Sequence, residues 1–237
     1  MDKKSQNTQL THTELASQLP EGFVEAVLTS FDIDEASVLL AKAFFTNPAD
    51  VFFYPDLDTR FEKLLWLMKT NLHIRFALAR SFAARDTEGK IAAMGFWHTP
   101  GSDGPSLSLL IRSGVWEMPF RQGLRTYLNV QKVTEIQEQR RKAALKGRPS
   151  WFLRNMVVSP DHQGHRLGSS VLRRELKFVV DSSPYPASLN TQRAENVKFY
   201  ERLGFVVAND EKIVIDGYEF PNWVMIYEGK NQRSDQI

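Results

Sequence analysis

Residues 151–169 read W-F-L-R-N-M-V-V-S-P-D-H-Q-G-H-R-L-G-S and contain the pattern that decides the fold. Trp151 to Val158 is a nearly continuous apolar run, interrupted by Arg154 and Asn155, and such runs are typical of strands buried on both faces. A proline ends the strand, and a glycine-containing loop then leads into a helix predicted from about Leu167 to Val180. Backbone N–H groups at a helix N-terminus attract anions, so this order predicts a phosphate site.

The same loop has a second interpretation, a strand-to-helix turn that holds no ligand, because short glycine motifs are common. The loop lacks the G-x-G-x-x-G of dinucleotide-binding folds and the G-K-[ST] ending of nucleotide-triphosphate loops. If a ligand binds here, we therefore expect a phosphorylated cofactor of another kind.

The loop resembles motif A of the GNAT acetyltransferases, whose pattern is [QR]-x-x-G-x-[GA]. Gln163 and Gly168 match its first and last positions, whereas Arg166 replaces the middle glycine. Residues 196–205, N-V-K-F-Y-E-R-L-G-F, resemble motif B of the same family. The similarity is strong from Trp151 to Val207 and weaker around Lys90 to Pro100, and elsewhere only the order of the expected elements is compatible.

This resemblance implies an α/β (α+β) GNAT fold, with a mixed central sheet, a splayed pair of parallel strands and flanking helices. We expect one acetyltransferase domain over residues 21–229, between a flexible N-terminal segment (1–20) and a flexible tail (230–237). The implied activity is direct acetyl transfer from acetyl-CoA to a primary amine of a small molecule. Two alternatives stay open, an acyl-CoA-binding sensor domain and a protein N-acetyltransferase.

In the family, the pyrophosphate of CoA binds to backbone N–H groups of the motif A loop. Arg166 keeps its N–H, but if its position requires a left-handed backbone, arginine costs about 1 kcal/mol or more. Its guanidinium either binds a CoA phosphate or is simply solvated. Carried over by position, the pyrophosphate contacts are Gln163, Gly164, His165, Arg166, Leu167, Gly168 and Ser169.

The strand before the loop carries a β-bulge in the family and splays from its parallel neighbour, which admits the acetyl-pantetheine arm. By position, the contacts with this arm fall on Met156, Val157 and Val158. A backbone N–H freed by the bulge would stabilise the thioester oxygen as charge develops on it. Their apolar side chains fit a purely structural role equally well.

Tyr200 resembles the family's general acid, which protonates the departing CoA thiolate. Phenol and thiol pKa values are about 10 and 8.5, so this transfer is feasible in a dry site. Asn196 at the start of the same motif is expected to orient the cofactor or the helix start. The alternative for Tyr200 is a packed tyrosine whose hydroxyl has a structural partner.

The general base is not evident from the motifs. In one member of the family a glutamate precedes a threonine on the strand before motif B, and Asn190, which cannot act as a base, stands there in this chain. His98 and Glu195 are candidates because they lie near the relevant segments. The resemblance implies an acceptor site built by the first two helices and the final strand pair. Aromatic residues in or near those segments would wall a pocket for a flat or apolar amine, namely Phe52, Phe53, Tyr54, Trp97, Trp116 and Tyr218.

The composition of the chain bears on its cofactors, its partners and its location. The chain has no cysteine, which excludes disulfides, thiolate metal ligands and an acetyl-cysteine intermediate, and we expect no metal cofactor. Its net charge of +2 gives no electrostatic case for nucleic acid. No apolar run approaches the roughly 18–20 residues that span a bilayer, and residues 2–13 are too polar for a secretory signal. We therefore expect a cytoplasmic protein without membrane partners, and a homodimer stays open.

The rest of the chain predicts alternating helices and strands. Asp32 with Glu35, and Thr59 with Glu62, suggest capping boxes at two helix starts. Residues 107–146 have a mostly helical pattern, interrupted near Gly114 and Pro119. Strands are expected at residues 23–31, 82–85, 90–98, 187–191, 205–208, 212–215 and 223–227, and a further helix at 197–203.

Overall fold

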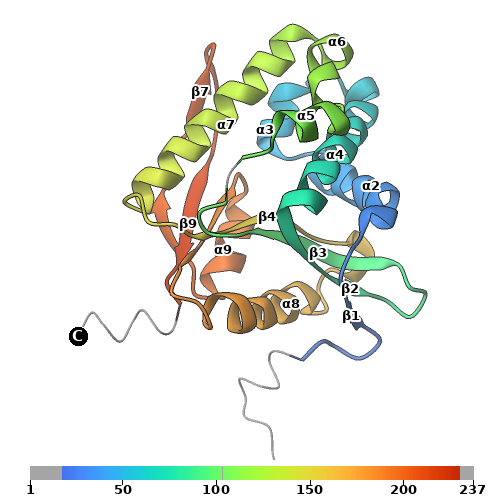
Figure 1. The fold of residues 1–237 in the computed structure, drawn as a ribbon, viewed down its shortest axis with the longest axis vertical. Coiled ribbons are helices and arrows are strands. Elements are labelled where there is room, and N and C mark those ends of the chain that lie inside the picture. Colours follow the sequence, from blue (N-terminus) through green and yellow to red (C-terminus); the bar gives the residue numbers. More distant parts are fainter. Residues whose placement is uncertain (1–17, 103, 230–237) are drawn as a thin grey trace, which may run out of the picture.

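A mixed seven-stranded sheet forms the centre of the protein (Figure 1), in a computed structural model that describes residues 18–102 and 104–229. The strand order is β1-β2-β3-β4-β5-β9-β6, with β4 and β5 parallel and the other neighbours antiparallel. Two shorter strands, β7 (Ile213–Ile215) and β8 (Tyr218–Phe220), form a hairpin beside the yellow-green helix α7 (Leu124–Ala144). The bounds in the main sheet are β1 Val24–Ala26, β2 Ala79–Arg85, β3 Ile91–His98, β4 Trp151–Val158, β5 Ala187–Thr191, β6 Val206–Asn209 and β9 Trp223–Tyr227.

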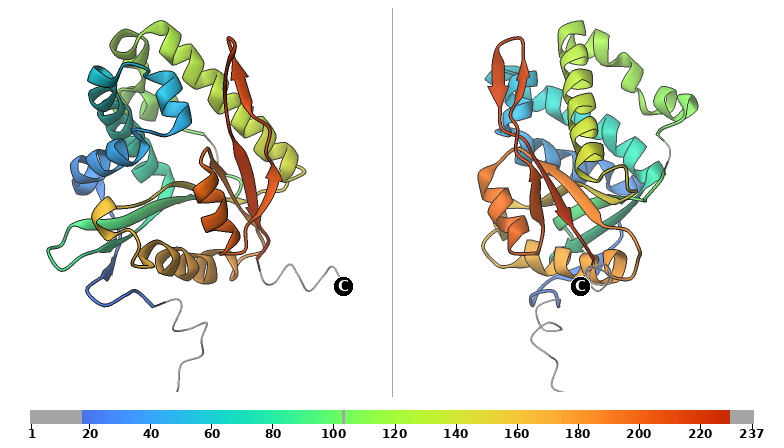
Figure 2. Two further views of the ribbon diagram at one scale, coloured as in Figure 1. Left: turned by 180° about the vertical axis from the view of Figure 1, so that it is seen from behind. Right: turned by 90° about the vertical axis from the view of Figure 1, so that its left-hand side faces the viewer.

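Helices cover both faces of the sheet (Figure 2). On one face lie α8 (Leu167–Glu175), its π-helical continuation Leu176–Val180, and α9 (Ala194–Glu201). The other face carries α2 (Ile33–Phe44), α3 (Pro48–Phe53), α4 (Leu57–Leu78), α5 (Leu107–Ser113), α6 (Met118–Gln122) and α7 (Leu124–Ala144). Short 3-10 turns occupy Ser30–Asp32, Val115–Glu117 and Pro160–His162.

Each face of the sheet has its own hydrophobic core. Leu172 of α8 and Leu189 of β5 belong to the first, and Leu40 of α2 and Leu64 of α4 belong to the second. All four side chains are at most 1% exposed. The predicted fold class is confirmed, because apolar strands with helices on both faces give this layered arrangement.

Neither predicted capping box forms with the predicted partners. Asp32 is the N-cap residue of α2, as predicted, but its side chain makes no capping hydrogen bond with that helix. It completes a box with Thr29, whose N–H donates to Asp32 Oδ2 at 2.7 Å, and Glu35 instead accepts the Ile91 N–H at 2.6 Å. The true N-cap of α4 is Asp56, which accepts from the Asp58 N–H at 3.1 Å. In both cases another good capping residue lies about three positions earlier, and sequence spacing does not choose between such candidates.

Residues 107–146 are helical as predicted, but the breaks differ in cause. Gly114 and Gly123, at φ of 79° and 90°, end helices in backbone conformations that glycine adopts without strain. Pro119 causes no break, because it lies in the first turn of α6, where a missing N–H has no intrahelical partner to lose. The strand expected at 23–31 is only three residues long, and strand β8 was not predicted. The proposed tail, 230–237, and most of the N-terminal segment lie outside the described residues.

Candidate functional site

The parallel strands β4 and β5 pair over only part of their length. Their register joins Trp151 with Ala187, Phe152 with Ser188 and Leu153 with Leu189. Beyond Leu153, β4 continues to Val158 and β5 to Thr191 without pairing to each other. The predicted splay is therefore confirmed, and a gap opens between the two strands.

Strand β4 contains the predicted β-bulge. Val157 opposes Met94 and Arg154 opposes Phe96, so Asn155 and Met156 together face the single residue Gly95. Asn155 has φ of 54°, in the left-handed region that asparagine tolerates better than most residues. A bulge leaves the extra residue outside the ladder and frees backbone groups for another partner.

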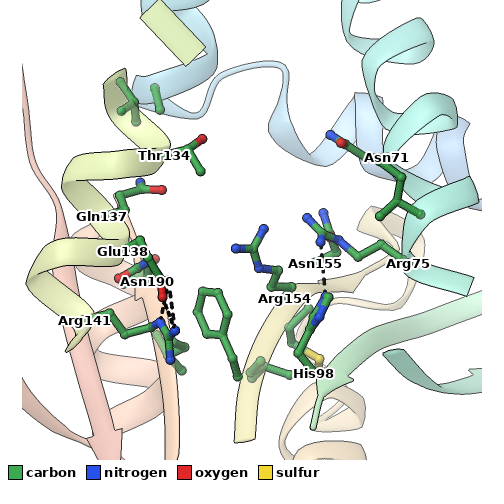
Figure 3. Close-up of a pocket in the computed structure, with 18 of the residues that line it drawn as sticks. Asn71, Arg75, His98, Thr134, Gln137, Glu138, Arg141, Arg154, Asn155 and Asn190 are labelled. Carbon is green, nitrogen blue, oxygen red and sulfur yellow. Dashed lines mark hydrogen bonds and ion pairs between the residues drawn. The ribbon is translucent and has the colours of Figure 1, made fainter. Parts of the chain in front are cut away.

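The extra residue places two consecutive side chains on one face of the sheet. The Arg154 guanidinium lies 4.5 Å from the ring centre of Phe152, and Asn155 Oδ1 accepts a bond from Arg75 Nε of α4 at 3.2 Å. Both therefore face α4 and α7 (Figure 3). Met156 packs against the core on the α8 face instead. Without the bulge, alternation along a strand would send Asn155 to the α8 face.

A cleft of about 990 Å³ lies between α4, α7 and this face of β4 and β5. Of the predicted site residues, Met156, Asn196 and Tyr200 line it, as does Asn190. Val157 is buried in the α2/α4 core, and Val158 packs toward α8, so their side chains do not line the cleft. Their predicted contacts use backbone atoms and do not depend on those side chains.

Tyr200 lies where α9 meets the gap between the strands. It is 8% exposed, and its ring contacts Phe199 and Phe205 at centroid distances of 5.1 and 5.6 Å. Burial raises the pKa of its phenol above the ordinary value of 10. The hydroxyl therefore stays protonated at neutral pH, which suits a proton donor and not a base.

The predicted phosphate loop has a left-handed backbone at Arg166, with φ of 61° and ψ of 4° at the N-cap of α8. The Arg166 side chain makes no capping hydrogen bond. The first N–H groups of an α-helix, here those of Leu167, Gly168 and Ser169, have no intrahelical acceptor and are free for another ligand. The side chain of Gln163 donates to the Val158 carbonyl at 3.2 Å and holds the loop against the end of β4.

Gly168 is required for packing. A Cβ at this position would lie 2.8 Å from Cγ2 of Val158, closer than carbon atoms approach without strain. The glycine therefore lets α8 lie directly on β4. A hollow of about 370 Å³ adjoins the loop, and its lining includes Phe23, His162, Gly164, His165 and Arg166.

Comparison with known proteins agrees with this geometry. Residues 131–207 match the family described as acetyltransferase (GNAT) domain. This segment, about a third of the chain, is similar to a GNAT acetyltransferase domain. The match confirms the predicted enzyme class, an N-acetyltransferase.

Two solved structures share the fold of this chain. The first, from Corynebacterium glutamicum, is described as "histone acetyltransferase HPA2 and related acetyltransferase". It has a TM-score of 0.58 and 19% identity, and the match covers 88% of this chain and 97% of the other. The second is arylalkylamine N-acetyltransferase 2 from Aedes aegypti, with a TM-score of 0.57 and 13% identity, covering 88% and 99%. At these identities the similarity shows the fold alone.

Neither of the predicted candidates, His98 and Glu195, is suited to be the general base. Arg75 Nη1 donates to His98 Nε2 at 3.1 Å, and burial together with Arg75, Arg154 and Arg141 lowers the pKa of His98 to about 3. Such a weakly basic imidazole, with one ring nitrogen already in use, is a poor proton acceptor. Glu195 is exposed, does not line the cleft, and pairs with Arg193 at 3.5 Å.

A different acid, Asp50 of α3, lines the cleft, and no sequence motif indicates it. It is 6% exposed, and Asn47 Nδ2 donates to its Oδ2 at 2.7 Å. Burial raises the pKa of Asp50 from 3.8 to about 7, although Asn47 and Arg193 oppose the shift. In sequence it is one more acidic residue in the first turn of a short helix, and nothing local distinguishes it.

The predicted aromatic pocket is mostly wrong. Only Phe53 among the six candidates lines the cleft. Trp97 is fully buried beneath the sheet, and Tyr54 is 2% exposed in the α2/α4 core. Phe52 stacks on Tyr218 at 5.0 Å in the small core next to the hairpin, and Trp116 is 56% exposed at the surface. The cleft is lined instead by aliphatic and polar residues in similar measure, together with charged groups such as Arg75, Arg154 and Asp50. Within the described ranges 18–102 and 104–229, no group of three or more His, Cys, Asp or Glu side chains could hold a metal ion, and no helix could cross a bilayer.

Proposed function

We propose that this protein transfers an acetyl group from acetyl-CoA to the primary amine of a small molecule bound in the α4/α7 cleft. The observation that carries the proposal is the bulged, splayed β4–β5 pair, whose gap leads into the cleft beside Tyr200. This geometry offers one opening for a thioester arm and a separate space for an acceptor. Both substrates would then be bound together, as direct transfer requires.

The cofactor site is proposed to run from the loop to the gap. Backbone N–H groups of residues 163–169 would bind the CoA pyrophosphate at the start of α8, and the pantetheine arm would follow Met156, Val157 and Val158. Asn196 Nδ2 donates to Thr191 Oγ1 at 3.2 Å, so it ties the start of α9 to the end of β5. We propose that Asn196 thereby positions Tyr200 as well as the cofactor.

In the proposed chemistry, the neutral amine nitrogen attacks the thioester carbonyl carbon. The new C–N bond forms, the C–S bond breaks, and the phenol proton of Tyr200 passes to the departing thiolate. The attacking nitrogen then gives up one proton, which restores the phenol. An ammonium must first lose a proton, and Asp50 is the proposed acceptor because it is a carboxylate at the cleft wall, held by Asn47. A base whose pKa lies near the working pH is the efficient kind.

The acceptor is not assigned by resemblance. Residues 151–207 resemble puromycin N-acetyltransferase in particular, but Asn190 stands where that enzyme has a glutamate. Asn190 Oδ1 is buried at the cleft without a hydrogen-bond partner among the described residues. We propose that it accepts a hydrogen bond from the acceptor amine and does not take its proton, since an amide cannot act as a base.

The test has two independent parts. Acetyl-CoA should raise the melting temperature and release heat on binding, because a ligand of the native state stabilises it. A library of small amines, with a lysine peptide as the protein-substrate arm, should then release CoA and yield an acetylated product. A protein that gives neither a thermal shift nor heat with saturating acetyl-CoA would refute the cofactor assignment.

A further inference from the structure

Two arginine side chains at the floor of the cleft have no carboxylate partner among the described residues. They are Arg75 of α4 and Arg154 of β4, and both line the cleft (Figure 3). The other arginines of the lining are neutralised. Arg141 pairs with Glu138 at 2.7 Å, and Arg148 pairs with Glu228 at 2.5 Å.

Neutral groups hold the unpaired guanidiniums in place. Arg75 donates through Nε to Asn155 and through Nη1 to His98, which orients the group without cancelling its charge. Arg154 lies over the ring of Phe152, and its Nε is buried with no hydrogen-bond partner within the described chain. A guanidinium stacked by its face keeps its edge of N–H donors available.

An unpaired cation in a partly dry cleft raises the free energy of the folded protein unless an anionic ligand pairs with it. Burial lowers the pKa of Arg154 to about 10, and burial together with Arg154 lowers the pKa of Arg75. Arg154 is charged at neutral pH at this value. The one carboxylate that raises its pKa is Glu138, which already binds Arg141 and lies 3.6 Å from Lys142.

We propose that the acceptor carries, besides its amine, an oxyanion group that Arg154 and Arg75 bind. A carboxylate or a phosphate ester has the oxygen spacing that a guanidinium edge binds through two parallel hydrogen bonds. The proposal rests on the proposed function and narrows its substrate class. The same floor repels polycations, so polyamines are poor acceptors for this cleft.

Matched pairs of amines test the charge requirement without any variant. β-Alanine against β-alaninamide, and 4-aminobenzoate against 4-aminobenzamide, differ only in the carboxylate. O-phosphoethanolamine against ethanolamine tests the phosphate arm. We expect the anionic member of at least one pair to have a kcat/KM, or a binding constant by calorimetry, that is higher by about tenfold or more. If every neutral member equals or exceeds its anionic partner in both measurements, the inference is wrong.

Variants then assign the effect to the arginines. Arg154→Gln and Arg75→Gln should lower the anionic-to-neutral ratio to about one, and Arg154→Lys should keep part of it. Arg148→Gln is the matched control, because it removes a cleft arginine that is already paired, and it should leave the ratio unchanged. Arg154→Gln loses no ion pair and only the contact with the Phe152 ring, so its melting temperature should change little. A lower melting temperature with an unchanged ratio would instead assign Arg154 a structural role and overturn the inference.

The cofactor measurement separates this inference from the proposed function. Acetyl-CoA binding that persists while anionic amines gain nothing leaves the acetyltransferase proposal intact and removes only the substrate class. If the wild-type protein does not bind acetyl-CoA, the proposed function is refuted. Calorimetry with the amine pairs would still show whether Arg75 and Arg154 bind an oxyanion group.

Discussion

The loop at the start of α8 and the floor of the α4/α7 cleft lie on opposite faces of β4, and each offers positive charge in a different form. The loop offers main-chain N–H groups, which carry partial charges, at a helix start that follows the exposed residues 163–166. The floor offers formal charges on Arg75 and Arg154, partly buried and without a carboxylate. Because partial charges are weaker than formal ones, we expect an empty loop to cost the fold less electrostatic free energy than an empty floor, whose cost the right ligand would relieve.

Removing the group that joins the two regions should have the largest effect. Tyr200 lies at the gap between them, and Tyr200→Phe deletes one oxygen while keeping the ring contacts with Phe199 and Phe205. We expect kcat to fall by roughly 10²–10⁴, the usual value of a positioned acid. The KM for acetyl-CoA should barely change, since the interaction is made mainly in the transition state. Steady-state kinetics with an acceptor from the amine library measure both.

Tyr227→Phe is the matched control for Tyr200. It also removes a buried tyrosine hydroxyl, one that donates to Asp181 at 2.9 Å and does not line the cleft. Its kcat should stay near the wild-type value. A Tyr200→Phe protein with wild-type turnover, under conditions where chemistry limits the rate, would make Tyr200 a packing residue and leave the thiolate to be protonated by another group.

Two titratable groups of the cleft should also make stability depend on pH. The folded-state pKa of Asp50 is raised from 3.8 to about 7, so the native protein keeps a proton that the unfolded chain releases between those values. The Asp50 contribution to the free energy of unfolding therefore falls as pH rises from about 4 to about 7. His98 acts oppositely, because its pKa is lowered from 6.5 to about 3 and its contribution falls as pH drops through that window.

Single variants separate these opposing contributions. Asp50→Asn should leave a free energy of unfolding that rises more steeply with pH between about 4 and 6.5 than in the wild type. His98→Gln should leave one that falls more steeply with pH. Urea unfolding at several pH values measures the slopes, with Arg166→Gly of the loop as the reference. Identical slopes for Asp50→Asn and the wild type would contradict the raised pKa.

What the sequence predicts well is what lies contiguous in the chain. The strand, bulge, loop and helix of residues 151–180 follow one another, so a local motif describes them and the structure confirms the splay and the bulge. The arginine floor has no such motif, because Arg75 comes from α4 and Arg154 from β4, and only the fold brings them together. One signal was present in the sequence, since Arg154 and Asn155 interrupt an otherwise apolar strand.

Asp50, the proposed base, shows the same limit of prediction from sequence. Asp50 becomes distinctive through burial and through its position at the cleft, and neither property is visible in the sequence of a short helix. The aromatic pocket failed for the related reason that residue type does not reveal direction. Trp97 lies on a strand that borders the site, yet its side chain faces the α8 core.

Two glycines of the loop should respond differently to alanine, and the difference tests how tightly α8 must lie on β4. Gly168→Ala places a Cβ 2.8 Å from Val158 Cγ2, so we expect a loss of about 1–3 kcal/mol in stability, typical of overpacking, and weaker acetyl-CoA binding. Gly164 has no atom within 4 Å of the new Cβ but has φ of 85°, so Gly164→Ala should cost about 1 kcal/mol through backbone strain alone. Thermal unfolding and calorimetry with acetyl-CoA measure both effects. Equal losses in the two variants would show that helix–strand contact does not limit the loop.

The smallest effect is expected at Arg166, where the loop departs from the family pattern. Its backbone is left-handed, which costs a residue with a Cβ about 1–2 kcal/mol, whereas glycine adopts it freely. Glycine also loses more conformational entropy on folding, about 0.5–1 kcal/mol, so Arg166→Gly should change stability by less than about 1 kcal/mol, with a small gain as the expected sign. Acetyl-CoA affinity should stay within about tenfold, because the N–H at this position is kept. Arg166→Ala is the informative companion, since it removes the guanidinium but keeps the strained backbone. If both variants lose far more than tenfold in affinity, the Arg166 side chain binds a CoA phosphate directly, and the loop then shares with the cleft floor its use of a formal charge.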